Sequence, residues 1–212
     1  MSNNLYSHID GRRDLVIDDK LSSISKDLEA VVFDLDGTLT DSIGNILKCT
    51  AHTFEFYKLP KPDDKQITKD YREIFSAHKE YQIDVLFDGI EPLLKTLRDR
   101  NIKIGYASGR SMTGIKRTLD ATFLGDYCDG ICAGSEVPSK PNPLMMQTVC
   151  QRLNVNVNKV LGVGDSGLDI KMYQNANALS LGVQTGVWSG EALKELHPTF
   201  LLPAIGDLTR YL

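Results

Sequence analysis

Short apolar runs alternate with amphipathic helical stretches along most of the chain. A buried strand of a parallel sheet has this continuous apolar character, because helices cover both faces of the sheet. The strand-like runs lie at 30–33, 102–107, 130–133, 160–163 and 178–183, and helical stretches lie between them at 91–100, 113–124 and 144–153. Strands that alternate with helices predict an α/β fold, a Rossmann-like parallel sheet flanked by helices with right-handed crossovers.

One stretch interrupts this alternation after the first strand. Apolar residues from Ile43 to Tyr57 share one helical face, and Pro60 and Pro62 end that helix because proline cannot continue the hydrogen-bond ladder. A second helical segment follows at about 63–80. The pattern therefore predicts three parts: an N-terminal extension at 1–29, an α/β core at 30–42 and 86–212, and an inserted helical unit at 43–85.

Composition and charge narrow the functional class. The 212 residues are 42% hydrophobic and 25% charged, with a formal net charge of -4, which is typical of a globular protein and gives no basic stripe for nucleic acid. No apolar run reaches the roughly 18 residues of a membrane-spanning helix, and the N-terminus lacks the apolar segment of a secretory signal. We therefore expect a cytoplasmic protein with neither a membrane nor a nucleic-acid partner. The sequence does not predict an oligomeric state.

The cysteines do not form a metal-binding pattern. Cys128 and Cys132 are four residues apart, but no second Cys or His pair accompanies them, as a structural zinc site would require. We expect reduced, packed thiols at these two positions and at Cys49 and Cys150.

The first strand runs into a pair of acidic residues. Asp34 and Asp36 are two positions apart, so in an extended chain both side chains would lie on the same side. Adjacent carboxylates repel each other, and such a pair needs a cation or a division of roles. Gly37 lets the backbone bend and approach a ligand closely.

Two further segments offer groups for an anion. The second strand ends at Ser108 and Gly109, which can present a hydroxyl and a backbone N–H, and Arg110 beside them is a candidate substrate contact. Lys140 lies in a loop next to Pro141, where its side chain could serve as a fixed positive charge. Each signal is weak alone, since Ser-Gly pairs are common in plain turns.

The fourth strand ends in a second acidic pair. Asp165 follows the strand, and Asp169 would lie on the same face of the helix that begins there. The carboxyl ends of strands in an open α/β sheet converge, so four carboxylates would meet one lysine. Burying unpaired charge costs several kcal/mol per ion, which calls for a divalent cation, and oxygen-only ligands suit Mg²⁺. Mg²⁺, Lys140 and the Ser108 hydroxyl together would form a receptor for a phosphoryl group.

These four segments resemble the ordered motifs of the haloacid dehalogenase superfamily. The resemblance rests on Asp34-Leu35-Asp36-Gly37-Thr38, Ser108, Lys140 and Gly164-Asp165 with Asp169, and it covers roughly residues 30–212. The stretch 182–193 is also similar to the phosphoglycolate-phosphatase-like and phosphonatase-like branches. The insertion at 43–85 is shorter than the usual cap, and the 29-residue leader lies outside the family pattern.

The resemblance implies a role for each residue. Asp34 would be the nucleophile and a metal ligand, and Asp36 the general acid and base, with its backbone carbonyl on the metal. Ser108, Gly109 and Lys140 would hold the phosphate. Asp165 would bind Mg²⁺, and Asp169 would bind it or orient its waters. The insertion would be a cap over a small phosphorylated metabolite, and its possible contacts are Lys48, His52, Lys58 and Arg72.

Several functions remain compatible with these motifs. Ester hydrolysis through an aspartyl-phosphate is favoured, because phosphonatases and most dehalogenases lack the second aspartate that Asp36 provides. A phosphomutase keeps both aspartates and stays an alternative. A non-catalytic binding or regulatory module with the same fold is a further alternative, since fold alone does not fix function.

Overall fold

The structure is a computed structural model that describes residues 21–42, 54–55 and 84–212. Phe54 and Glu55 are helical, and the rest of the helical segments predicted at 43–57 and 63–80 lies outside the described residues. The four predicted cap contacts and Cys49 lie outside them as well. Within the described part of the chain, no helix has the length and apolar character needed to cross a bilayer.

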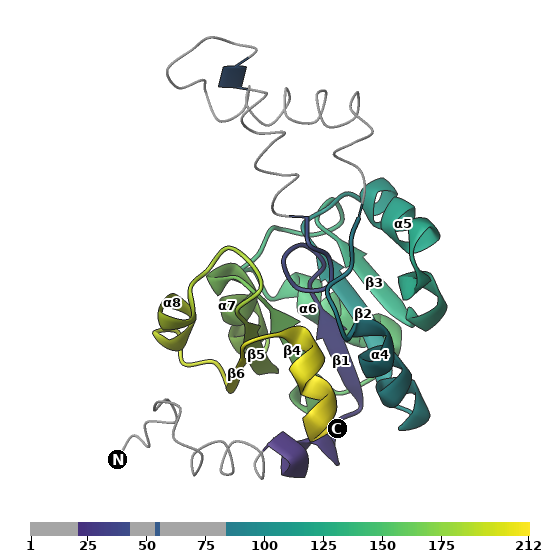
Figure 1. The fold of residues 1–212 in the computed structure, drawn as a ribbon, viewed down its shortest axis with the longest axis vertical. Coiled ribbons are helices and arrows are strands. Elements are labelled where there is room, and N and C mark those ends of the chain that lie inside the picture. The colour runs from purple at the N-terminus through teal and green to yellow at the C-terminus, as the bar shows by residue number, and fades with distance from the viewer. Residues whose placement is uncertain (1–20, 43–53, 56–83) are drawn as a thin grey trace.

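A six-stranded parallel sheet forms the centre of the molecule (Figure 1). Its order is β3-β2-β1-β4-β5-β6, and all five pairs of neighbours run parallel. The strands are β1 (Ala30–Phe33), β2 (Lys103–Ser108), β3 (Gly130–Ala133), β4 (Val160–Gly164), β5 (Leu179–Val183) and β6 (Phe200–Leu202). The predicted α/β fold with a parallel sheet is confirmed, and the sixth strand is an addition that the sequence pattern did not indicate.

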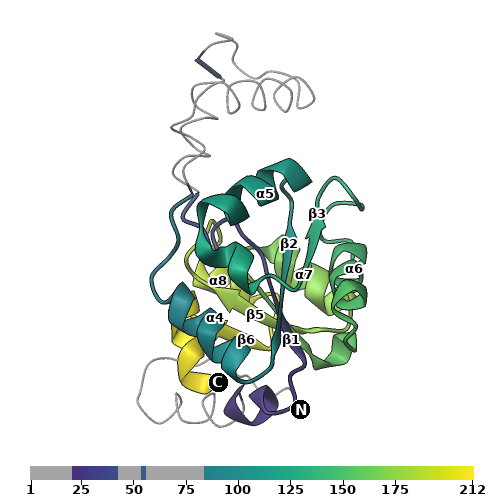
Figure 2. The same cartoon turned by 90° about the vertical axis from the view of Figure 1, so that its right-hand side faces the viewer.

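Helices cover both faces of this sheet (Figure 2). One face packs against α4 (Ile90–Asp99), α5 (Met112–Ala121) and the 3₁₀ segments η2 (Phe123–Tyr127) and η4 (Ile205–Tyr211). The other face packs against α6 (Leu144–Leu153) and α7 (Gly167–Asn175). The short elements η3 (Val157–Lys159) and α8 (Gly190–Lys194) complete the described set.

Strand β1 shows how the sequence builds these layers. Val31 and Phe33 belong to the cluster under α4, whereas Ala30 and Val32 belong to the cluster under α6. All four are fully buried, and burying each large apolar side chain contributes roughly 1.5–3 kcal/mol. An apolar residue on both faces is what a central parallel strand requires.

The structure describes part of the predicted N-terminal extension and both ends of the predicted insertion. In the predicted N-terminal extension, residues 21–25 are helical, and Leu21 and Leu28 are buried in the core. The chain leaves the sheet after β1 and returns beside it: the Asp41 N–H donates to the Val85 carbonyl at 2.7 Å and the Phe87 N–H to the Leu39 carbonyl at 3.1 Å. Both ends of the predicted insertion therefore lie together at the carboxyl end of β1.

Candidate active site

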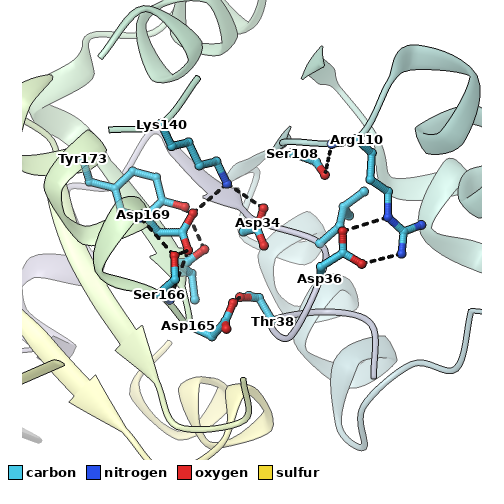
Figure 3. A network of polar contacts seen from close by, with 12 residues as sticks. Asp34, Asp36, Thr38, Ser108, Arg110, Lys140, Asp165, Ser166, Asp169 and Tyr173 are labelled. Atoms are coloured by element: carbon cyan, nitrogen blue, oxygen red, sulfur yellow. Dashed lines mark hydrogen bonds and ion pairs between the residues drawn. The ribbon is translucent and has the colours of Figure 1, made fainter. Parts of the chain in front are cut away.

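The predicted site residues lie where the strand order reverses. Strand β1 has β2 on one side and β4 on the other, and the carboxyl ends of such strands form the usual ligand crevice of an open α/β sheet. Asp34 directly follows β1, Ser108 ends β2 and Asp165 directly follows β4. Figure 3 shows these residues together with Lys140 and Asp169 around one space.

The loop after β1 sends its two aspartates in different directions. The Asp34 N–H continues the sheet by donating to the Val163 carbonyl at 2.9 Å, but the chain then turns, and the Leu35 carbonyl accepts from the Thr38 and Thr40 N–H groups. Asp34 faces Lys140, whereas Asp36 points toward Arg110 (Figure 3). The expectation that both carboxylates lie on the same side was wrong, because it assumed an extended chain past Asp34.

Three buried carboxylates share the space around Lys140. Carboxylate oxygens of Asp34, Asp165 and Asp169 lie within 4.8 Å of one another. The Lys140 ammonium donates to Asp34 Oδ1 and to Asp169 Oδ1, at 2.6 Å in each case. Asp36 is not a member of this group, so its side chain does not contribute to the acidic cluster.

The electrostatics of the cluster show an excess of negative charge. Burial raises the pKa of Asp34, and the charges of Asp169 and Asp36 add to that effect, while Lys140 opposes it. Burial also raises the pKa of Asp165 to about 6, with a further contribution from the charge of Asp169. Burial lowers the pKa of Lys140, but the charges of Asp169 and Asp34 outweigh it and hold the ammonium protonated. One ammonium therefore balances only part of the charge of three carboxylates.

Glycines allow the chain to pack against Asp165. Gly37 has a φ of 79°, which favours glycine, and a Cβ at this position would lie 2.7 Å from Asp165 Oδ2. A Cβ at Gly186 would lie even closer to the same carboxylate. Asp165 accepts hydrogen bonds from Thr38 Oγ1 at 3.2 Å and from the Val187 N–H at 3.1 Å. These contacts fix the orientation of the carboxylate.

A capping box at the start of α7 fixes Asp169. Ser166 is the N-cap residue and accepts from the Asp169 N–H, while Asp169 Oδ2 accepts from the Ser166 N–H at 3.1 Å and from its hydroxyl at 2.5 Å. The other oxygen of Asp169 faces Lys140. Because α7 begins at Gly167, Asp165 precedes the helix, and the expectation that Asp165 and Asp169 share a helix face was wrong. The two carboxylates meet because the chain turns between them.

The donor set fits a divalent cation. Asp34, Asp165 and Asp169 supply three buried carboxylates with oxygen atoms close enough to share one ion, and the oxygen-only chemistry suits a hard cation. Among the described residues, Lys140 is the one cation paired with these carboxylates, and Asp165 has neutral donors such as Thr38 and Val187. Uncompensated burial of charge is costly, which is the physical reason for an ion here.

The end of β2 offers space for an anion. Ser108 is buried, and its Oγ accepts from the Arg110 N–H at 3.2 Å, which leaves the hydroxyl hydrogen for another acceptor. A Cβ at Gly109 would meet no described atom within 4 Å, so this backbone borders open space. Gly134 packs closely against Gly109, where a Cβ would collide with the Gly109 carbonyl oxygen, and this holds the turn in place.

A second cation pairs with a separate set of carboxylates. Arg110 donates to both oxygens of Asp36, from Nε at 2.9 Å and from one terminal nitrogen at 2.6 Å, and to Asp84 Oδ1 at 2.8 Å. Burial alone would raise the pKa of Asp36, but the hydrogen bonds and charge of Arg110 hold it below its ordinary value. Sequence reasoning placed Arg110 near substrate and did not identify Asp84.

Other residues of the site had only partial sequence signals. The missed residues are Thr38, Ser42, Asp84, Thr118 and Ser166. Thr38 and Ser42 belong to the first acidic motif, and Ser166 stands three residues before an acidic residue at a helix start, which is a known capping pattern. Asp84 and Thr118 carry no local signal, because their partner Arg110 is 26 and 8 residues away.

Comparison with known proteins gives a consistent family match. The family model described as haloacid dehalogenase-like hydrolase matches residues 50–177, which is more than half of the chain and includes Ser108, Lys140, Asp165 and Asp169. PpaX of Clostridium perfringens (strain 13 / Type A), a pyrophosphatase by name, is 30% identical over 82% of this chain and 92% of its own length. A phosphoglycolate phosphatase of Vibrio parahaemolyticus serotype O3:K6 (strain RIMD 2210633) is 22% identical over 86% of this chain and 95% of its own.

Solved structures share the fold. A hydrolase of the haloacid dehalogenase-like family from Streptococcus pneumoniae, SP0104, superposes with a TM-score of 0.77 at 19% identity. The superposition covers 87% of this chain and 98% of that protein. At this identity the likeness concerns the arrangement of the backbone.

Proposed function

Because the chain belongs to the haloacid dehalogenase-like hydrolase family, we propose that it is a Mg²⁺-dependent phosphatase that hydrolyses small phosphorylated metabolites. The observation that supports this most directly is the cluster of Asp34, Asp165 and Asp169 around Lys140. Relatives that are named as a pyrophosphatase and as a phosphoglycolate phosphatase support a phosphorylated substrate.

In this proposal Asp34 and Asp165 would hold Mg²⁺ together with the backbone carbonyl of Asp36. When bound, Mg²⁺ would offset negative charge on the phosphoryl oxygens, which is the main requirement of phosphoryl transfer. Asp169 contributes either as a ligand or by orienting water on the ion.

Asp34 is the proposed nucleophile. Its carboxylate attacks phosphorus in line and displaces the alcohol, which forms an aspartyl-phosphate and splits one difficult step into two easier ones. Lys140, 2.6 Å from Asp34 Oδ1, orients the attacking oxygen and offsets charge on the transferred group. The Ser108 hydroxyl and the Gly109 N–H would bind the phosphoryl oxygens at the open end of β2.

Asp36 is the proposed general acid and base. It donates a proton to the leaving oxygen in the first step and takes one from the attacking water in the second. The paired carboxylate seen in the structure is the form that accepts a proton from water. In the first step the donated proton would sit on Oδ2 of Asp36, which accepts from Arg110 Nε with one lone pair and keeps a second.

The insertion at 43–85 is the proposed cap. Its two ends lie together beside β1, where Asp41 and Phe87 bond to Val85 and Leu39. A unit that leaves and returns at this point stands next to the site, which suits a cover over a small substrate. The core would then consist of 30–42 and 86–212, with residues 1–29 as the N-terminal extension.

Phosphate release tests the proposal. Wild-type protein should release phosphate from p-nitrophenyl phosphate and from one or more compounds of a panel that includes pyrophosphate and phosphoglycolate, and a chelator should stop the reaction. Asp34→Asn should lower the rate by at least about 1,000-fold, since the covalent route is removed. Wild-type rates in Asp34→Asn, or no release from any compound with Mg²⁺ present, would reject the assignment.

The same assay separates the two alternatives. Conversion of a sugar phosphate into its isomer without phosphate release would identify a phosphomutase, for which Asp36 is equally suitable. Neither phosphate release nor isomer formation from any compound of the panel would favour a binding or regulatory module.

A further inference from the structure

Arg110 has almost all of its hydrogen-bonding capacity engaged within the protein. A guanidinium has five N–H donors, and Arg110 makes four hydrogen bonds to side chains with them. Two go to Asp36 and one to Asp84, and the fourth runs from Nη1 to Thr118 Oγ1 at 2.5 Å. Its side chain is only 14% exposed. A residue so occupied has little left to offer to a phosphate.

The contacts of Arg110 also divide the acidic side chains into two sets. Lys140 pairs with Asp34 and Asp169, while Arg110 pairs with Asp36 and Asp84. Figure 3 shows Asp36 turned from the cluster toward the guanidinium. If Arg110 released Asp36, its carboxylate could turn toward the cluster, where Lys140 pairs with only two of the three carboxylates.

We infer that Arg110 is a positioning residue that holds the Asp36 carboxylate out of the metal cluster and in a fixed orientation, and that it does not bind the substrate phosphate. This inference rests on the proposed function, in which Asp36 is the acid and base. The paired geometry supports it, since two parallel N–H···O bonds fix the plane of the carboxylate as well as its position.

Arg110 itself is anchored from the side of the insertion. Asp84, whose side chain is 5% exposed, accepts from Arg110 and from the Thr118 hydroxyl at 2.7 Å, and Thr118 is fully buried on α5. The Ser42 hydroxyl also donates to Asp36 Oδ1. Ser42 directly precedes the proposed insertion at 43–85, and Asp84 is near its last residue. The network thus ties Asp36 to both ends of that segment.

A kinetic comparison distinguishes positioning from phosphate binding. Arg110→Met should lower kcat for p-nitrophenyl phosphate roughly 100-fold, the range expected when general acid–base catalysis is lost. KM and the inhibition constant of inorganic phosphate should each stay within about threefold of wild type, because the phosphate contacts at Ser108 and Lys140 remain. Arg110→Lys should also lose kcat, because a lysine cannot make the two parallel bonds.

A double variant shows whether Arg110 acts through Asp36. Arg110→Met combined with Asp36→Ala should be no slower than Asp36→Ala alone, within about threefold, since both changes remove the same effect. The matched control is Arg98→Met, which breaks an ion pair to Asp129 on the surface and should keep wild-type kinetics. Circular dichroism and melting curves check the fold, and Arg110→Lys provides the same test if the methionine variant does not fold.

Three outcomes would overturn the inference while leaving the proposed function intact. The first is a KM and a phosphate inhibition constant that rise more than about tenfold with kcat retained, which would make Arg110 a phosphate contact. The second is a multiplicative loss in the double variant, which would make Arg110 independent of Asp36. The third is an unchanged kcat in Arg110→Met. Failure of the wild type to release phosphate with Mg²⁺ would reject the proposed function itself.

Discussion

Asp165 is the acidic residue of the cluster whose charge has the least compensation. Asp34 and Asp169 each pair with Lys140, whereas Asp165 makes no ion pair among the described residues and accepts hydrogen bonds from neutral donors, which include the Thr38 hydroxyl and the Val187 N–H. A buried carboxylate with neutral donors alone has its pKa raised, here to about 6. Asp165 therefore needs a cation as Asp34 does, whose pKa burial raises to about 8 despite its pairing with Lys140.

This imbalance predicts a pH-dependent effect of Asp165→Asn on stability. The folded-state pKa of Asp165 lies above its unfolded value. The stabilisation that protonated Asp165 gives the folded state is therefore fully present below about pH 4 and is lost as the pH rises through about 6. In chelator, the free energy of unfolding of Asp165→Asn relative to wild type should rise by about 1 kcal/mol or more between pH 5 and pH 8. Urea denaturation at both pH values measures this difference, and a constant difference would contradict the account.

The backbone conformation at Gly37 leads us to expect that Gly37→Ala lowers both stability and Mg²⁺ affinity. Gly37→Ala forces an alanine to a φ of 79° and places its Cβ 2.7 Å from the Asp165 carboxylate. We expect a loss of about 1–2 kcal/mol in the free energy of unfolding and weaker Mg²⁺ binding. The matched control is Gly114→Ala within α5, where the nearest atom to the new Cβ is 3.5 Å away. If both variants unfold at the same urea concentration, Gly37 does not have this role.

At the scale of the elements, helix α7 connects the fold to the site. Its N-cap residue Ser166 and its third residue Asp169 bond to each other, and Asp169 also holds Lys140. The helix start therefore orients a site residue with the same hydrogen bonds that satisfy its own first N–H groups.

Ser166→Ala tests whether the same hydrogen bonds cap α7 and orient Asp169. Loss of an N-cap hydroxyl should cost about 1 kcal/mol in the free energy of unfolding, and the freed Asp169 should also weaken Mg²⁺ binding. Ser189→Ala is the matched control, because the Ser189 side chain also accepts from a backbone N–H at a helix start, that of Ala192 in α8. It should lose stability with unchanged Mg²⁺ affinity. Equal Mg²⁺ affinities in both variants would show that the capping box does not support Mg²⁺ binding.

The sequence pattern predicted the long elements and missed the short ones. Strands β1 and β3 begin and end where the apolar runs do, and β2 is shifted by one residue from the predicted 102–107. Strand β6 has three residues and helix α8 has five, too few for a periodic pattern to show. Helix α5 is shorter than the predicted 113–124, because the chain continues as the 3₁₀ segment η2.

At the scale of the whole molecule, the sequence could place residues at strand ends but not orient them. Parallel topology brings Lys140 to Asp34 from 106 residues away, as the converging strand ends led us to expect. The pairing of Arg110 with Asp36, 74 residues apart, depends on where one loop turns, and a periodic pattern contains no such information. Three of the four predicted carboxylates, Asp34, Asp165 and Asp169, therefore converge, whereas Asp36 pairs with Arg110 instead.

Calorimetric titration of Mg²⁺ into the wild-type protein and into Asp165→Asn, near neutral pH, tests the proposed metal site directly. We predict saturable binding of one ion per chain to the wild type and an affinity at least about tenfold weaker for the variant. Arg98→Met, which alters a surface ion pair away from the cluster, should bind as the wild type does. Equal Mg²⁺ binding by wild type and Asp165→Asn, or no binding by either, would contradict a metal site among Asp34, Asp165 and Asp169.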